Sequence, residues 1–369
     1  MGTHSFLALD EIKITDTEVG IDSPAQERGA SRLEKEVTMK IDVFPHILPT
    51  KFMEALHKEE GLGHFKHLHQ VIPTLFDLDA RFRIMDQFDG LMQIINIAAP
   101  PLENISDLQK AKDLARLGND EMAELVLKYR DRFAAALACI PMHDMDIALG
   151  ELDRAVNELN FKGVQIYTPI NDKPLDSEEF FPLYEKMSEY NLPILLHPQR
   201  EGDYPDYRTE KASKYTLSSS LGWPYETTTA MVRLVLSGVM EKFPELKIVT
   251  HHCGGMVPFM VNRIAGFVEA GEIFGSRKGP GKLRKKVPDY LKRFYADTAI
   301  YGYTPGLMCG YAFFGASHLL FGTDMPFDSQ FGLRWTRETI DSIERMDISP
   351  AEKKMIFEDN ARRLFRLTV

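Results

Sequence analysis

Residues 162–197 read KGVQIYTPINDKPLDSEEFFPLYEKMSEYNLPILLH, and this stretch decides the fold. It begins and ends with short apolar runs, KGVQIYT (162–168) and PILLH (193–197), which are typical of buried strands. Between them, SEEFFPLYEKMSEYN (177–191) carries apolar residues at helical spacing. A strand, a helix and a second strand predict one βα repeat of a parallel sheet, because parallel neighbours need a crossover connection.

The same alternation continues along the chain from Met39. The candidate strands are MKIDVF (39–44), LMQIINIA (91–98), AAALACIP (134–141), KGVQIYT (162–168), PILLH (193–197), LKIVTHH (246–252), RFYADTA (293–299) and HLLFGTD (318–324). Eight βα units in 369 residues predict a closed (β/α)8 TIM barrel of the α/β class. An open doubly wound sheet is disfavoured, because no Gly-rich phosphate-binding motif follows the first strand.

The barrel is predicted to span residues 39–369, with residues 1–38 as an N-terminal extension. The extension is polar and shows no sustained apolar period. Two interpretations stay open for it: a flexible tail, or an arm that packs on a partner subunit.

Composition excludes several classes of protein. The net charge of −10 argues against a nucleic-acid-binding face, which would be basic. The three cysteines, Cys139, Cys253 and Cys309, are odd in number and far apart, so neither a disulfide framework nor a Cys-rich zinc module fits. No apolar run approaches the roughly 18 residues of a membrane span, and the N-terminus lacks the order of a signal peptide. We therefore expect a cytoplasmic protein without a nucleic-acid or membrane partner.

Polar residues gather at the carboxyl ends of the predicted strands. These residues are His46, His197, His251, His252, Asp297 and Asp324. In a barrel the carboxyl ends of all strands meet at one mouth. Imidazole and carboxylate groups bind zinc, iron or manganese, and a catalytic metal needs about three protein ligands and an open position. The pattern predicts a metal site at the barrel mouth.

With these residues in place, the sequence resembles the amidohydrolase-related group that includes aminocarboxymuconate semialdehyde decarboxylase and the resorcylate-type decarboxylases. The resemblance is carried by IDVFPHILP (41–49), FKGVQIYTP (161–169), LPILLHP (192–198), LSGVMEKFPELKIVTHHCGGMVPFMVNRI (236–264), FYADTA (294–299) and LLFGTDMPF (319–327). It implies that His46, His197 and Asp324 bind a metal. It also implies that His252, six residues before Pro258, is the acid/base residue. His251 is then an additional imidazole, either a partner of a ligand or a ligand of a second metal.

One position departs from the family pattern. Where such enzymes carry the first histidine of a His-x-His pair, this chain has Phe44, which cannot coordinate a metal. Three alternatives follow. The remaining residues could hold one metal, the barrel could be non-catalytic and poor in metal, or the chain could support a sister subunit that keeps the full ligand set.

These alternatives give three functional hypotheses. The first is a metal-dependent decarboxylase or hydrolase of a small carboxylic acid, a homo-oligomer with one divalent transition metal, either zinc or iron or manganese. Arg200 and Arg208, in the loop after the fifth strand, are its candidates for binding the substrate carboxylate. The second is a supporting subunit that pairs with a paralogous amidohydrolase-fold barrel in a dinuclear iron or manganese monooxygenase of a small acid or amino acid. The third is a pseudoenzyme without metal.

Overall fold

A computed structural model describes residues 38–60, 62, 65–275 and 283–368. The predicted N-terminal extension therefore lies outside the described residues, apart from residue 38, and its boundary stays a prediction. Among the described residues, no helix is both long enough and apolar enough to cross a membrane.

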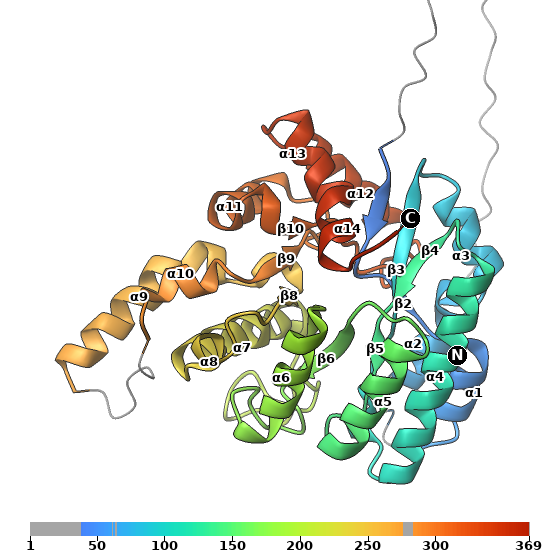
Figure 1. The fold of residues 1–369 in the computed structure, drawn as a ribbon, viewed down its shortest axis with the longest axis horizontal. Coiled ribbons are helices and arrows are strands. Elements are labelled where there is room, and N and C mark those ends of the chain that lie inside the picture. The colour runs from blue at the N-terminus through green and yellow to red at the C-terminus, as the bar shows by residue number, and fades with distance from the viewer. Residues whose placement is uncertain (1–37, 61, 63–64, 276–282, 369) are drawn as a thin grey trace, which may run out of the picture. The chain divides into compact units, whose positions relative to one another are not determined.

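Within the described residues, ten short strands form one sheet of four strands and one of six (Figure 1). They are β1 Lys40–Asp42, β2 His46–Ile47, β3 Leu91–Ile97, β4 Phe133–Ala136, β5 Ala138–Cys139, β6 Val164–Thr168, β7 Ile194–Pro198, β8 Ile248–Thr250, β9 Tyr295–Asp297 and β10 Leu319–Leu320. All their pairings are parallel. The predicted first strand, 39–44, contains β1, and β2 begins two residues beyond its end. The predicted third strand is divided into β4 and β5, and all eight predicted strands occur in the predicted order.

Backbone hydrogen bonds join the two sheets at both edges. The Leu137 N–H donates to the Ile95 carbonyl at 3.0 Å, beside the break between β4 and β5. At the other edge, the Val43 N–H donates to Phe321 at 2.9 Å and the Asp324 N–H donates to Phe44 at 3.1 Å. The first and last strands are thus neighbours, and the (β/α)8 barrel predicted from the sequence is confirmed.

Helices occupy the connections between the strands. They are α1 Thr50–Leu56, α2 Phe65–Val71, α3 Leu78–Met85, α4 Leu108–Lys128, α5 Met145–Asn157, α6 Phe181–Tyr190, α7 Trp223–Leu236, α8 Val239–Lys242, α9 Val257–Ile273, α10 Val287–Leu291, α11 Thr304–Phe314, α12 Leu333–Glu344, α13 Pro350–Lys354 and α14 Asn360–Leu364. In α5, for example, Ala148, Leu152 and Ala155 form a buried stripe at helical spacing. The Asp144 side chain caps this helix by accepting a hydrogen bond from the Ile147 N–H at 2.9 Å.

The barrel interior is apolar along most of its length and polar at the mouth. Leu195 on β7 and Val249 on β8 belong to one buried apolar cluster inside the barrel. Side chains two residues apart on a strand share a face, so His197 and His251 follow these residues on the inner side. Strand alternation therefore directs both imidazoles into the mouth.

Candidate metal centre

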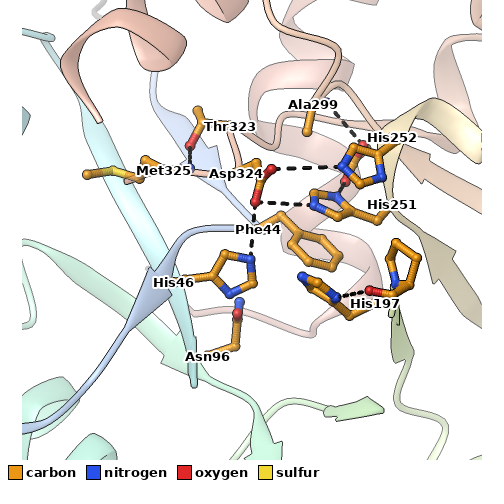
Figure 2. A network of polar contacts seen from close by, with 12 residues as sticks. Phe44, His46, Asn96, His197, His251, His252, Ala299, Thr323, Asp324 and Met325 are labelled. Atoms are coloured by element: carbon orange, nitrogen blue, oxygen red, sulfur yellow. Dashed lines mark hydrogen bonds and ion pairs between the residues drawn. The ribbon is translucent and has the colours of Figure 1, made fainter. Parts of the chain in front are cut away.

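Three histidines and one aspartate from different strands converge at the mouth (Figure 2). His46 lies on β2, His197 on β7, His251 directly after β8, and Asp324 shortly after β10. All four side chains are buried, with at most 3% of their surface exposed. Buried imidazoles and a buried carboxylate need compensating partners, and these four residues face one another instead of solvent.

The ligand atoms are close together without forming hydrogen bonds to one another. One oxygen of Asp324, Oδ1, lies 3.3 Å from His46 Nε2 and 3.3 Å from His251 Nε2. All three atoms are buried, and none makes a well-aligned hydrogen bond. The ligand atoms of His46, His197 and His251 also lie within 4.8 Å of one another. Buried polar atoms that meet at one point without bonding are the arrangement expected around a cation.

Outer contacts fix the orientation of two of the imidazoles. His251 Nδ1 is hydrogen-bonded to a carboxylate oxygen of Asp297, and His197 Nδ1 lies 2.6 Å from the Pro198 carbonyl oxygen. Because a carbonyl can only accept, His197 Nδ1 carries the proton and its Nε2 keeps a free electron pair. The Asp297 carboxylate likewise accepts a hydrogen bond from the proton on His251 Nδ1, and His251 Nε2 faces the cluster. This is how proteins orient metal-binding histidines.

A second carboxylate positions the backbone around Asp324. Asp42 accepts hydrogen bonds from the N–H groups of Phe44 and Thr323, at 3.1 and 3.0 Å, and from the Thr323 hydroxyl at 2.5 Å. Burial raises the pKa of Asp42 to about 6, although these hydrogen bonds favour its charged form. Asp324 itself has a φ of 62°, which is uncommon for a residue other than glycine. Asp42 therefore ties the first strand to the segment that carries Asp324.

The electrostatics of the cluster suit cation binding. Burial lowers the pKa of His46 and of His197, so both imidazoles are neutral near pH 7. Burial raises the pKa of Asp324, but the charge of His251 and the close approach of the imidazole nitrogens of His251, His252 and His46 outweigh burial and hold this pKa well below its usual value. Burial lowers the pKa of His251, while Asp297 and Asp324 raise it by more, to about 9. A cation at the cluster would displace the proton from His251.

Phe44, the residue that departs from the predicted His-x-His pair, packs on the rings of its neighbours. Its ring is fully buried and stacks on the His251 imidazole, with centroids 3.8 Å apart and planes 7° apart. It also lies edge-on to His46 at 5.6 Å. The aromatic ring of Phe44 thus packs flat against the His251 imidazole and supplies no ligand atom to the cluster.

His252 lies beside the cluster, next to His251 and Asp324. Its ring is 3.9 Å from that of His251 between centroids, and its Nε2 is 3.8 Å from Asp324 Oδ2. The Tyr301 hydroxyl lies 3.4 Å from the same nitrogen and donates to Asp324 Oδ2 at 2.7 Å. Burial and the charge of His251 lower the pKa of His252.

Tyr301 and Trp223 were not predicted from the sequence. The Trp223 ring lies 5.4 Å from His197 and 6.2 Å from His252 between centroids, and its buried indole N–H makes no hydrogen bond among the described residues. Tyr301 lies in the irregular connection after β9, and Trp223 is the first residue of α7, at the end of the long connection after β7, so neither position gives a periodic signal of its own. Only their position shortly after a strand end or within a long mouth loop could have indicated them.

Arg200, one of the two arginines predicted to bind substrate, contacts residues outside the histidine cluster. Arg200 donates to Glu226 Oε1 at 2.8 Å and stacks over the Tyr204 ring at 4.0 Å. It lines a cavity of about 730 Å³ together with Gln199. Arg208 is exposed. Among the described residues no hydrogen bond or ion pair joins either arginine to the cluster, so a substrate-binding role for them stays a prediction.

The family follows from comparison with known sequences. The family model described as "Amidohydrolase" matches residues 64–367. The chain belongs to the amidohydrolase family. This amidohydrolase is 32% identical over 322 residues to the γ-resorcylate decarboxylase of Polaromonas sp., a match that covers 85% of the chain and 95% of the relative.

Two solved structures share the fold of this amidohydrolase. The 5-carboxyvanillate decarboxylase of Sphingomonas paucimobilis has a TM-score of 0.78 at 26% identity, covering 90% of this chain and 100% of that one. A dihydroxybenzoic acid decarboxylase from Polaromonas sp., solved with bound manganese and the inhibitor 2-nitroresorcinol, has a TM-score of 0.73 at 29% identity. That match covers 89% of this chain and 97% of the other. The predicted resemblance to the amidohydrolase-related decarboxylases is confirmed.

Proposed function

We propose that the chain is a metal-dependent decarboxylase of a small aromatic carboxylic acid. The observation that carries the proposal is the position of His252, a buried imidazole whose Nε2 contacts Tyr301 beside Asp324, which in turn contacts His46 and His251. Relatives that are named as decarboxylases of aromatic acids support an aromatic carboxylic acid as the substrate class.

Four residues would hold one divalent cation: His46, His197, His251 and Asp324. Buried ligand atoms of His46, His251 and Asp324 make no hydrogen bond among the described residues, and the mixture of imidazole and carboxylate accepts manganese, zinc or iron. We favour manganese, which the similar structure from Polaromonas sp. contains. When bound, such a metal supplies Lewis-acid binding of the oxygens of a substrate carboxylate or phenol group.

The reaction replaces a carboxylate on carbon by hydrogen and releases carbon dioxide, so one proton must reach that carbon. His252 is placed to carry this proton at Nε2, the nitrogen in contact with Tyr301. Burial lowers the pKa of His252, which makes its protonated form a stronger acid than an ordinary histidine. Tyr301 keeps the imidazole aligned with Asp324.

The surroundings of His252 suit an aromatic ring. The ring of Trp223 lies 6.2 Å from that of His252, and the ring of Tyr301, which stacks on Trp335 at 3.9 Å, lies 6.3 Å from it between centroids. Flat aromatic side chains favour stacked or edge-on contact with an aromatic substrate. The unpartnered indole N–H of Trp223 would donate to a substrate oxygen. Arg200 and Arg208 remain further candidates for that oxygen.

The test is carbon dioxide release by the manganese-loaded chain from 2,6-dihydroxybenzoate and 5-carboxyvanillate. We expect turnover of at least one of these acids, and a loss of about 100-fold or more in kcat for His252→Ala with metal content unchanged. His318→Ala is the matched control, since His318 stacks on Tyr295 outside the cluster. Full activity of the metal-loaded His252→Ala variant would contradict the proposed proton transfer.

The other hypotheses predict different results in the same assay. Hydrolysis would consume an amide or ester without releasing carbon dioxide. A supporting subunit of a two-component monooxygenase would be inactive alone and would become active with a paralogous barrel, iron or manganese, and oxygen. A pseudoenzyme would bind little metal and turn over none of these substrates.

A further inference from the structure

Arg81 on α3 is fully buried, although it carries a charge that the proposed reaction does not use. Burial lowers the pKa of its guanidinium to about 10, and the charge of Asp42 opposes this fall. One guanidinium nitrogen, Nη2, makes no hydrogen bond among the described residues. A buried charge is weak evidence for stability, because removing it from water costs free energy. The hydrogen-bond partners of Arg81 indicate a different role.

The guanidinium of Arg81 bonds to three acceptors from different parts of the mouth. Nη1 donates to the carbonyl oxygen of His46 at 2.8 Å and to that of Thr74 at 3.0 Å. Nε donates to Oε1 of Gln93, on β3, at 2.8 Å. His46 belongs to β2, a strand of two residues, so few ladder hydrogen bonds hold its backbone. Arg81 therefore fixes the backbone that carries one proposed metal ligand.

These bonds continue to the segment that carries Asp324, a second proposed ligand. The Arg81 N–H can only donate, so the Gln93 amide turns its oxygen to Arg81 and its NH₂ to the Met325 sulfur, at 2.8 Å. Met325 follows Asp324 in the chain (Figure 2), and its carbonyl oxygen accepts a hydrogen bond from the His46 N–H at 2.8 Å. A closed circuit of hydrogen bonds thus joins the backbones of both ligands through Arg81.

We propose that Arg81 is a positioning residue of the metal centre, which sets the His46 imidazole and the Asp324 carboxylate at the separation that one cation requires. His46 Nε2 and Asp324 Oδ1 lie 3.3 Å apart, and neither atom makes a well-aligned hydrogen bond. The inference rests on the metal centre of the proposed function but not on the decarboxylation itself. Outer partners of ligands typically change metal affinity by about 10- to 100-fold.

The charge of Arg81 and its hydrogen bonds have opposite effects on a bound cation. Burial lowers the pKa of His46, contacts with Asp324 oppose this fall, and the charge of Arg81 adds to it, so the field of the guanidinium reaches this ligand. A positive charge there repels a metal cation. If Arg81 acted through its charge alone, an apolar replacement would strengthen metal binding. If Arg81 acts by positioning, the same replacement weakens it.

The test is isothermal titration of manganese into the chelator-treated full chain, for wild type, Arg81→Lys and Arg81→Met. We expect the dissociation constant to rise about 10- to 100-fold for Arg81→Met. Arg81→Lys should lie between wild type and Arg81→Met, because an ammonium group donates hydrogen bonds but lacks the planar fork of the guanidinium. Circular dichroism establishes that each variant is folded.

Arg293→Met is the matched control. Arg293 also donates to backbone carbonyls, those of Met240 and Pro244, but these lie outside the cluster. We expect this variant to bind manganese as tightly as wild type. A loss of affinity equal to that of Arg81→Met would show a general effect of losing a guanidinium and would overturn the inference.

Gln93→Leu breaks the circuit at a second point, between Arg81 and Met325, without a change of charge. We expect it to raise the manganese dissociation constant about tenfold, and it decides the question if Arg81→Met does not fold. Unchanged or tighter binding by the folded Arg81→Met variant, or by Gln93→Leu in its place, would overturn the inference.

The same titrations separate this inference from the proposed function. A wild type that binds manganese but releases no carbon dioxide would overturn the decarboxylase alone, since the affinities of the variants do not depend on turnover. A wild type that binds none of manganese, zinc and iron would overturn both.

Discussion

Replacing Asp297 by asparagine tests how His251 is made into a ligand. One oxygen of Asp297 accepts hydrogen bonds from the backbone N–H groups of Cys253 and Ala299, at 3.1 and 3.0 Å, and the other oxygen binds His251 Nδ1. In Asp297→Asn the amide oxygen must stay with the two backbone donors, so the amide NH₂ faces His251. Two donors then oppose each other, and His251 must move its proton from Nδ1 to Nε2, the nitrogen that faces Asp324.

The expected consequence is weaker metal binding with little change in fold. Loss of such an outer partner lowers metal affinity by about 10- to 100-fold, which corresponds to about 1.4–2.7 kcal/mol. Isothermal titration of manganese into the chelator-treated chain measures the affinity directly. Asp176→Asn, which breaks only the surface ion pair with Arg233, is the control. An affinity for Asp297→Asn within twofold of wild type would show that His251 is not a ligand.

Three further substitutions have defined outcomes. Phe44→Ala removes a fully buried ring and should lower the free energy of unfolding, measured by urea titration, by about 3–5 kcal/mol. A decrease below about 1 kcal/mol would contradict the close packing of the Phe44 ring. Burial raises the pKa of Glu103 from 4.5 to about 7, so the folded chain favours the protonated form of this side chain. The stability that the protonated form contributes is complete below pH 4.5 and is lost as the pH rises through 7. Between pH 4.5 and 7 the unfolding free energy of wild type should therefore fall by up to about 3 kcal/mol more than that of Glu103→Gln. Identical pH profiles of the two proteins would refute the raised pKa of Glu103. Tyr301→Phe removes the hydroxyl that donates to Asp324 and should lower kcat roughly tenfold at unchanged metal content, and an unaltered kcat would exclude a positioning role.

The barrel could be predicted because its signals are local and repeated. The run at 162–197 folds as β6, α6 and β7 within a few residues of the predicted limits, since buried strands and amphipathic helices each leave a short-range pattern. The strand-end positions of His46, His197, His251 and Asp324 likewise followed from the rule that carboxyl ends meet at the mouth.

The role of Phe44 could not be predicted from the sequence. Its substitution for a histidine indicated a lost ligand, but only the three-dimensional packing reveals that the same ring stacks on His251. The partners Asp297 and His251 lie 46 residues apart in the chain, and no periodicity relates them. Tyr301 and Trp223 were missed for a similar reason, because long connections between strands carry no regular pattern.

The most direct test is the manganese content per chain of four proteins after chelator treatment and reloading: wild type, His46→Ala, His251→Ala and the control His318→Ala. If His251 replaces the ligand that Phe44 cannot supply, wild type and His318→Ala retain about one manganese per chain, and His251→Ala loses as much metal as His46→Ala. Full retention by His251→Ala, with loss confined to His46→Ala, would contradict the four-residue metal centre. A wild-type chain that takes up no manganese, zinc or iron would contradict a metal-dependent decarboxylase altogether.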